Sequence, residues 1–288
     1  MRGDMDPIFF RQHAVALVLA LTTILAPAAG RAEEWAKQGE ERFLVSGGVF
    51  LPFFSTSLGV DNEDRGEGET VDLEQDLGFT EDVATGWFGG SWRFARRHRL
   101  SVSYFRFVRD VGGSVEREIA IGDEIYPVGA TLDTRFAIQT VPITYSYSFL
   151  QREKYELVGS LGVHWWVNDL SAEGSTSLGG QDGDASASAT VHAPLPLLGL
   201  LFYYWTGPRW SMGVHAEALV LNIDADVLNY SGSFVSLSGR THYWFYNQLG
   251  VGGAVNWFDL DFDVDGEKWR GKIEYDYVGP QIYLVTRF

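Results

Sequence analysis

The feature that most constrains this chain is a two-residue alternation of apolar and polar side chains. Between residues 155 and 168 the odd positions carry apolar residues or glycine, whereas polar residues such as Glu156 and His164 occupy even positions. The ranges 141–149 and 210–220 alternate in the same way. Period two places alternate side chains on opposite faces of a β-strand, so these segments predict strands with one apolar and one polar face.

The positions of aromatic residues indicate whether the apolar faces of the strands meet lipid or a protein core. A soluble sandwich would bury these faces in its core, whereas a membrane barrel turns them toward lipid. Aromatic pairs gather close to the expected short turns, as they do in the interfacial girdles of membrane barrels. The pairs are Trp92/Phe94, Tyr147/Phe149 and Tyr243/Phe245. We therefore expect a barrel with a polar lumen.

Short and long connections alternate along the chain. Short turns are expected at 96–98, 151–154, 207–209 and 247–248, and long connections near 61–82, 113–130, 171–190, 225–232 and 263–271. The pattern predicts an all-β fold, an antiparallel up-and-down transmembrane β-barrel of ten strands, with short periplasmic turns and both termini in the periplasm. The expected strands are 43–59, 84–95, 99–113, 131–149, 155–170, 191–206, 210–224, 233–246, 249–262 and 272–288. Eight strands is the alternative, because 100–110 and 194–205 are apolar on both faces or change phase.

The amino terminus predicts export. Residues 14–25 read AVALVLALTTIL and precede APAAGRA, whose small residues suit a signal peptidase. This apolar run is too short for a membrane-spanning helix, which needs about 20 residues. We expect 1–32 to be a signal peptide cleaved after Ala28 or Ala32, 33–41 a periplasmic segment and 42–288 the barrel. A buried amino-terminal helix is the alternative.

The amino-acid composition limits the kinds of partner that this chain could bind. The chain has no cysteine and a formal net charge of −16. An acidic chain repels nucleic-acid backbones, and an exported chain without cysteine is held by hydrogen bonds and packing instead of disulfides. The long connection between Asp61 and Asp82 is rich in acid. Acidic extracellular loops could meet cations that bridge lipopolysaccharide phosphates, or could simply form a solvated surface.

The carboxy terminus carries an assembly pattern. In the last residues, VGPQIYLVTRF, Ile282, Leu284 and Phe288 share one face with Val278, and Arg287 lies on the other. A terminal aromatic on the lipid face resembles the signal that the barrel-assembly machinery recognises in outer-membrane proteins. We expect that machinery as a partner during biogenesis, outer-membrane lipid as the surroundings, and a monomer, because a closed ring needs no partner strand.

Several longer segments of the chain resemble segments of a known protein family. These are GGVFLPFFSTSLGVD, VDLEQDLGF, WRFARRHRLSVSY, YSYSFLQREKYELVGSLGVH, APLPLLGL and VGGAVNWFDLDFDVDG. Together they resemble a proteobacterial family of small outer-membrane β-barrel proteins of unsettled function, of the porin-like or OmpA-like barrel class. The resemblance spans most of the chain after residue 32. It implies a barrel fold and a Gram-negative outer-membrane location, and it implies no catalytic residues.

Charged and imidazole side chains are predicted to face the lumen. They are Arg93, Glu156, His164, His215, Glu217, Arg240, His242 and Arg287. They could line a narrow pore for small solutes. They could also pair into a network that plugs the barrel, because buried charges need compensation. The sequence favours a plugged barrel with a structural or surface-interaction role over the pore.

The sequence does not favour two further kinds of chemistry, metal binding and hydrolysis. Asp261, Asp263 and Asp265 open like a calcium loop, but Lys272 stands where the twelfth-position Glu is required, and the same alternation suits a strand. We therefore expect no metal and no cofactor. A hydrolase at the barrel rim is a third alternative, with Asp224/Asp226, Asp259/Asp261 or His164/Asp169 as candidate pairs. No protease or lipid-hydrolase signature is present, so an enzyme is not expected.

The carboxy-terminal pattern yields a first prediction. Deleting Phe288 should strongly reduce the amount of folded barrel in the outer membrane, because the terminal aromatic would guide assembly. Replacing Asp263 with Asn should leave that amount close to the parent level. The measurement is heat-modifiable barrel in isolated outer membranes, and equal yields for the two variants would contradict the prediction.

Overall fold

The computed structural model describes residues 39–61, 69–75, 79–80, 82–114, 119–121, 124–126, 131–178, 181–225, 228–266 and 270–288. All of them lie in one compact unit, Ala36–Phe288. The expected signal peptide falls outside the described residues and stays a prediction. The described part of the chain contains no helix long and apolar enough to cross a membrane.

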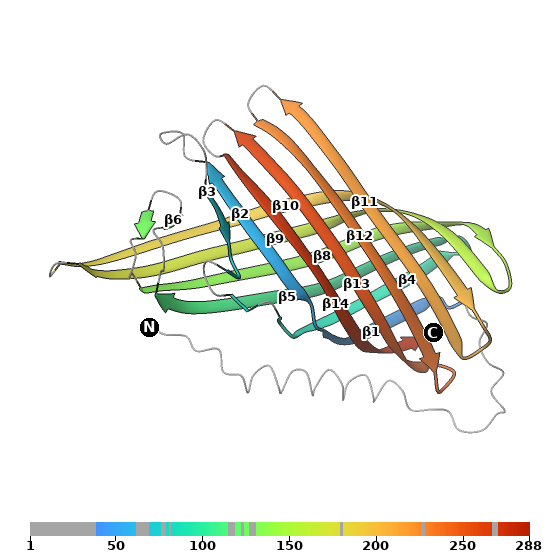
Figure 1. Cartoon of the computed structure of the whole chain (residues 1–288). Coiled ribbons are helices and arrows are strands. Elements are labelled where there is room, and N and C mark those ends of the chain that lie inside the picture. The colour runs from blue at the N-terminus through green and yellow to red at the C-terminus, as the bar shows by residue number, and fades with distance from the viewer. Residues whose placement is uncertain are drawn as a thin grey trace. The chain divides into compact units, whose positions relative to one another are not determined.

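Ten antiparallel strands form a closed ring (Figure 1). The ring strands are β1 (Phe43–Phe50), β4 (Thr85–Ala95), β5 (His98–Ser114), β8 (Thr131–Gln151), β9 (Tyr155–Leu178), β10 (Gln181–Trp205), β11 (Trp210–Ala225), β12 (Leu228–Trp244), β13 (Leu249–Gly266) and β14 (Arg270–Arg287). The ring closes because β1 pairs with β4 on one side and with β14 on the other. The expected ten-stranded barrel is thus confirmed, and the eight-stranded alternative is wrong.

The first expected strand, 43–59, is divided in two. β1 ends at Phe50 and β2 (Phe53–Asp61) continues along β14 after Leu51 and Pro52. Pro52 has no amide hydrogen to donate, so it interrupts the ladder. The amide of Leu51 instead donates to the carbonyl of Pro280, at 3.0 Å.

Three of the expected long connections are in fact paired strand. β9 and β10 continue through most of 171–190, to Leu178 and from Gln181, and β11, β12, β13 and β14 likewise extend into 225–232 and 263–271. The backbone ladder does not need lipid, so small residues such as those in ASASAT sustain it beyond the apolar zone. The expected loop boundaries were wrong for this reason.

The connections before β4 and after β5 contain short additional strands. β3 (Glu69–Asp72) pairs with β2, while β6 (Ile119–Ile121) and β7 (Glu124–Tyr126) form a separate two-stranded hairpin. Most of the acidic residues between Asp61 and Asp82 have no described side chain, so the prediction of acidic loops is not tested there.

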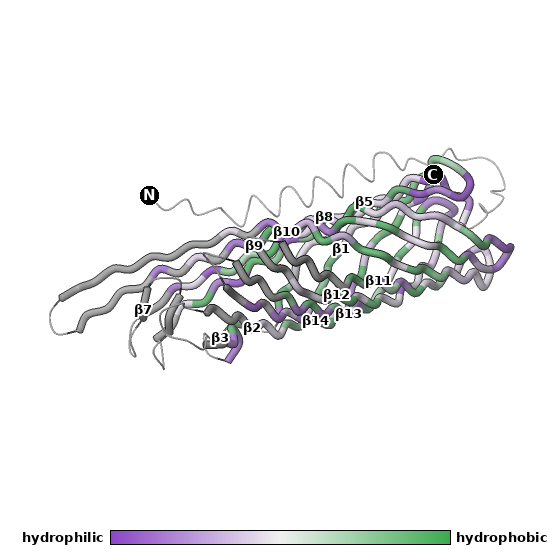
Figure 2. The backbone as a smooth tube through the Cα atoms, turned by 90° about the horizontal axis from the view of Figure 1, so that it is seen from above, coloured by the Kyte–Doolittle hydropathy of each residue, from purple (hydrophilic) through white to green (hydrophobic). Residues whose placement is uncertain are grey.

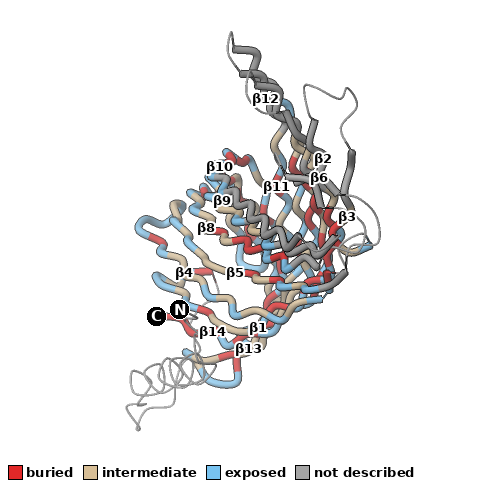
Figure 3. Tube along the Cα trace, turned by 90° about the vertical axis from the view of Figure 1, so that its left-hand side faces the viewer, coloured by how far each residue is buried: buried red, intermediate tan, exposed pale blue. Residues whose placement is uncertain are grey.

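The alternation of the sequence becomes an outer and an inner face. Along β9 the odd residues Leu161 and Trp165 are about half exposed, at 56% and 47%, whereas Glu156 and Trp166 are buried. Figure 3 shows buried and exposed residues alternating along the strands, and Figure 2 shows the same change between hydrophobic and hydrophilic residues. The carboxy-terminal residues Ile282, Leu284 and Phe288 all lie on the exposed apolar face.

The barrel wall has a seam between β10 and β11. Within the described residues these strands pair only from Leu198–Ala218 to Trp205–Ser211, while β10 stays paired with β9 as far as Gln181. Beyond that point the two strands run in different directions (Figure 1).

Two prolines explain where the seam begins. The Trp205 amide donates toward β9, to Lys154 O, and the Thr206 amide donates toward β11, to Trp210 O. Amide direction alternates along a strand, so even-numbered residues of β10 face β11. Pro194 and Pro196 are even-numbered and have no amide hydrogen, so two successive donors to β11 are missing.

The seam predicts a local contrast in hydrogen–deuterium exchange. The amide of His192 points toward the seam, whereas the amide of its neighbour Ala193 donates toward β9. We expect the His192 amide to exchange much faster than the Ala193 amide in the folded protein. Exchange measured residue by residue by NMR checks this, and equal protection at both positions would contradict the seam.

Candidate functional site: the lumen

The middle of the lumen is filled by a buried apolar cluster, here called the aromatic plug. Its members are Phe50, Phe54, Leu73, Phe79, Phe107, Phe136, Ile138, Trp166, Leu195, Leu197, Phe234, Phe258, Leu260, Tyr275 and Tyr277. Phe258 lies at its centre, with ring centroids 4.8 Å from both Phe234 and Tyr277 and 5.1 Å from Trp166. Rings at these distances are in close contact, as in the interior of a folded protein.

The plug explains the segments that are apolar on both faces. Phe105 and Phe107 in β5, and Leu195 and Leu197 in β10, point inward to the plug or pack against it. Their neighbours on the opposite face, such as Leu198, are exposed. The loss of clean alternation therefore marks where the lumen is apolar.

A buried arginine joins the plug to the connection after β3. Arg109 is 3% exposed, forms an ion pair with Glu74, and donates to Thr56 Oγ1 at 2.8 Å. Its guanidinium also lies over the ring of Phe54, 4.8 Å from the centroid. The Thr56 amide donates to Glu74 Oε2 at 2.8 Å, which holds the carboxylate in place.

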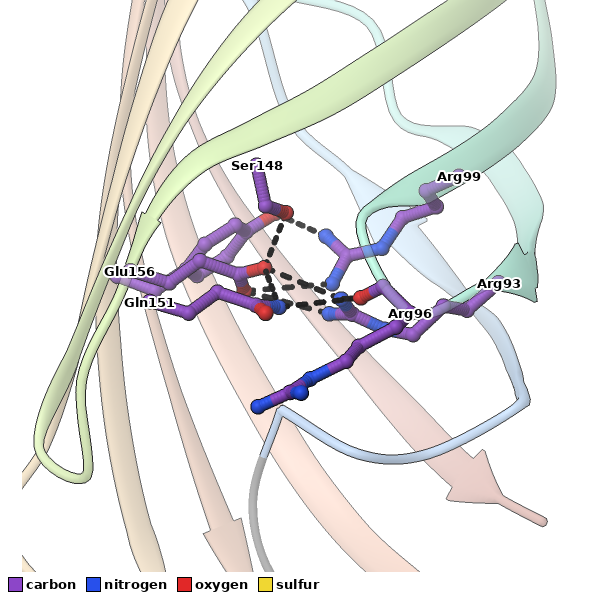
Figure 4. Close-up of polar contacts among 7 residues, drawn as sticks. Arg93, Arg96, Arg99, Ser148, Gln151 and Glu156 are labelled. Atoms are coloured by element: carbon purple, nitrogen blue, oxygen red, sulfur yellow. Dashed lines mark hydrogen bonds and ion pairs between the residues drawn. The ribbon is translucent and has the colours of Figure 1, made fainter.

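The lumen near the short turns holds a second polar group, the end network. It consists of Arg93, Arg99, Ser148, Gln151 and Glu156 (Figure 4). Arg93 makes two parallel bonds to Glu156, of 3.1 and 3.2 Å, and the Arg99 guanidinium lies 3.6 Å from the same carboxylate. Ser148 and Gln151 also donate to it. One carboxylate thus neutralises part of the charge of two arginines in a nearly dry setting.

A cavity of about 260 Å³, the lumen cavity, is lined by residues of both the plug and the end network. Tyr277 and Leu201 contribute apolar surface, and Arg99 and Glu156 contribute charge. Glycines on the inner face of the wall leave space for the larger side chains that line the cavity. A Cβ at Gly252 would lie 2.2 Å from the ring of Tyr283, so only glycine lets that ring lie against the wall.

In the cavity, the carboxylate of Glu217 lies close to two imidazole groups. Glu217 lies 3.6 Å from His164 Nε2 and 3.3 Å from His215 Nε2. On the neighbouring strand β12, His242 Nε2 lies 2.9 Å from the Tyr283 hydroxyl and its Nδ1 lies 3.3 Å from Ser211 Oγ. Within the described residues Arg240 has a single hydrogen bond, to Ser238 Oγ at 3.3 Å.

The eight side chains expected in the lumen therefore do not form one network. The structure places all of them on the inner side, and seven line the cavity, namely Glu156, His164, His215, Glu217, Arg240, His242 and Arg287. Arg93 lies beside it through its pair with Glu156. They fall into the end network, the group around Glu217, the His242–Tyr283 pair and two separate arginines.

Sequence reasoning missed Arg99, Arg109 and Glu74. The first two lie on the inner face of β5, at alternating positions with Ser101, Ser103 and the plug phenylalanines. The odd-numbered register of that strand could have identified them. Glu74 follows β3 in an irregular connection, where no periodicity indicates its direction.

Among the described side chains, no group that could hold a metal is present, and His164 and Asp169 are not brought together. The Asp261 carboxylate lies 3.4 Å from the Lys272 ammonium, so this carboxylate already has a cationic partner. The side chains of Asp263 and Asp265 lie outside the described ones, and Asp224 and Asp226 do as well. His164 faces the lumen, whereas Asp169 is exposed and accepts a bond from Thr190 on the neighbouring strand.

Comparisons with known proteins agree on the fold. No protein-family model and no curated protein matches the chain. The outer membrane protease OmpT from Escherichia coli aligns over 90% of this chain and 99% of its own, with a TM-score of 0.56 and 11% identity. The outer membrane protein OprG from Pseudomonas aeruginosa aligns over 88% and 99%, with a TM-score of 0.36 and 13% identity. The likeness to the outer membrane protease shows that the fold is that of an outer-membrane β-barrel, as the sequence resemblance implied.

The end network yields a prediction about stability. Replacing Glu156 with Gln should lower the free energy of unfolding by about 3–5 kcal/mol, because it leaves two buried guanidinium groups without a carboxylate. Glu153 is exposed on the adjoining turn and provides the matched control as Glu153→Gln. Urea unfolding of the refolded proteins in lipid is the measurement, and a similar stability for both variants would contradict the assignment.

Proposed function

We propose that this chain is an integral outer-membrane β-barrel with a structural or surface-interaction role, whose lumen is closed to solutes. The observation that carries the proposal is the aromatic plug. All ten ring strands contribute to it or pack against it, including Trp87 of β4 and Leu219 of β11 as partly buried neighbours. A solute crossing the barrel would have to separate these side chains.

The plug is a stronger barrier than a polar network of the same thickness. An ion passing through packed phenylalanine and leucine loses its hydration and gains no replacement partners, and apolar constrictions exclude water. The ion pair between Arg109 and Glu74 adds a second closure beside Phe54 and Phe79. The pore alternative is therefore less well supported than the closed barrel.

A surface role is supported by the long hairpins. The exposed apolar face of β9 reaches Trp165, yet its pairing with β10 continues to Leu178. Thirteen further residues correspond to about 40 Å of strand at the usual rise of a β-strand. This length of ordered hairpin would stand clear of the hydrocarbon and present a rigid surface for contacts.

The likeness to a protease supports no enzymatic proposal for this chain. It rests on 11% identity and concerns the arrangement of strands. His164 and Asp169, the nearest His and Asp along one strand, lie on opposite faces of the wall. A rim hydrolase therefore has no supporting observation among the described residues.

Single-channel recording tests the closed lumen. The refolded mature protein should give no steady conductance in a planar bilayer, whereas the double variant Phe234→Ala/Phe258→Ala should conduct, because it removes two rings from the centre of the plug. The matched control is Phe88→Ala/Phe202→Ala, which removes two rings from the exposed face and should stay silent. Steady conductance by the parent protein that Arg240→Ala alters would instead establish a pore.

A further inference from the structure

The charges around the lumen cavity do not balance. Among the described residues, Arg99, Arg240 and Arg287 line the cavity and Arg93 pairs with one of its carboxylates, and these four face the three carboxylates of Glu41, Glu156 and Glu217. A positive charge therefore remains even when every carboxylate is ionised and every imidazole is neutral. Such a charge in a confined space needs a counter-charge or strong hydration.

Among the described residues, Arg240 forms no ion pair with a carboxylate. Glu156 is engaged by Arg93 and Arg99, and Glu217 lies between His164 and His215. Arg240 contacts neither carboxylate, and its only hydrogen bond within the described part of the chain is the 3.3 Å contact with Ser238 Oγ.

The residues directly opposite Arg240 offer it no acceptor. Its direct partners across the sheet are Gly213 in β11 and Ala254 in β13, neither of which has a polar side chain. The carboxylate of Glu217 acts on the guanidinium electrostatically, without an ion pair between the two groups. Arg240 is also close enough to His242 and Tyr283 to affect both electrostatically.

Arg287 provides a second unsatisfied donor. Its side chain is 2% exposed, its Nε donates to Asn247 O at 2.7 Å, and its guanidinium lies 4.1 Å from the ring centroid of Trp244. Its Nη2 atom is buried and has no hydrogen-bond partner. A buried guanidinium nitrogen without an acceptor costs free energy that an anion would recover.

We propose that the lumen cavity binds a small oxyanion, a carboxylate or a phosphate group, with Arg240 as its principal partner. Hydroxyl groups of Ser211, Ser236 and Ser238 line the same cavity and supply neutral donors. At about 260 Å³ the cavity is below the usual range of drug-sized sites, which begins near 300 Å³. The site therefore suits a small anion and not a polymer or an intact lipid.

Calorimetric titration of the refolded protein in detergent micelles tests this inference. The probes are inorganic phosphate and benzoate, at an ionic strength held constant with chloride. We expect saturable binding of at least one probe, weakened at least tenfold by Arg240→Gln and less by Arg240→Lys, which keeps the charge. Arg152→Gln, an exposed arginine on the short turn before β9, is the matched control and should bind like the parent.

The two probes distinguish the two sources of an oxyanion. Binding of phosphate alone indicates a phosphate-bearing ligand, and binding of benzoate alone indicates a carboxylate, both in support of the site. Absence of binding for both probes would overturn the proposal, and so would equal binding by folded Arg240→Gln and Arg152→Gln. Circular dichroism establishes that each variant is folded. None of these results depends on whether the barrel conducts.

Discussion

The closed ring of backbone hydrogen bonds is the constraint on which the rest of this structure depends. Lipid offers no partner to a peptide group, so a barrel wall must satisfy its own donors and acceptors. The final link is made by the last residue, since the Arg42 and Phe43 amides donate to Phe288 O at 2.8 and 3.0 Å and the Phe288 amide returns a bond to Phe43 O at 2.9 Å. Where the ring is interrupted, at Leu51–Pro52 and along Pro194 and Pro196, a proline removes the donor.

Closing the ring creates an interior that must be filled or hydrated. This protein uses both solutions at different levels of one lumen. Packed aromatic side chains fill the centre, and charged groups surround a small cavity closer to the short turns. Glu156 shows how a charge becomes tolerable there, because it accepts hydrogen bonds from Arg93, Ser148 and Gln151 and forms an ion pair with Arg99. Arg240 lacks such a partner, and this difference separates structural charge from a candidate binding group.

Sequence patterns predicted the faces of the strands better than their lengths or the content of the lumen. Alternation places a side chain inside or outside, so the inward position of Glu156 and Glu217 followed directly. Pairing beyond the apolar zone depends on backbone partners, so residues 171–190 had no distinguishing side-chain pattern. The aromatic plug needed contacts among inward residues far apart in sequence, such as Trp166 and Phe258. Periodicity along one strand carries no information about such contacts.

Sided chemical labelling tests the closure of the lumen most directly, because the chain has no cysteine of its own. Ser238→Cys places one thiol beside the lumen cavity. A charged, membrane-impermeant thiol reagent is applied in a bilayer to the side of the long connections. We expect that this thiol does not react from that side while the plug is intact, and that Phe234→Ala/Phe258→Ala makes it reactive. Rapid reaction from that side with the plug intact would contradict a closed lumen.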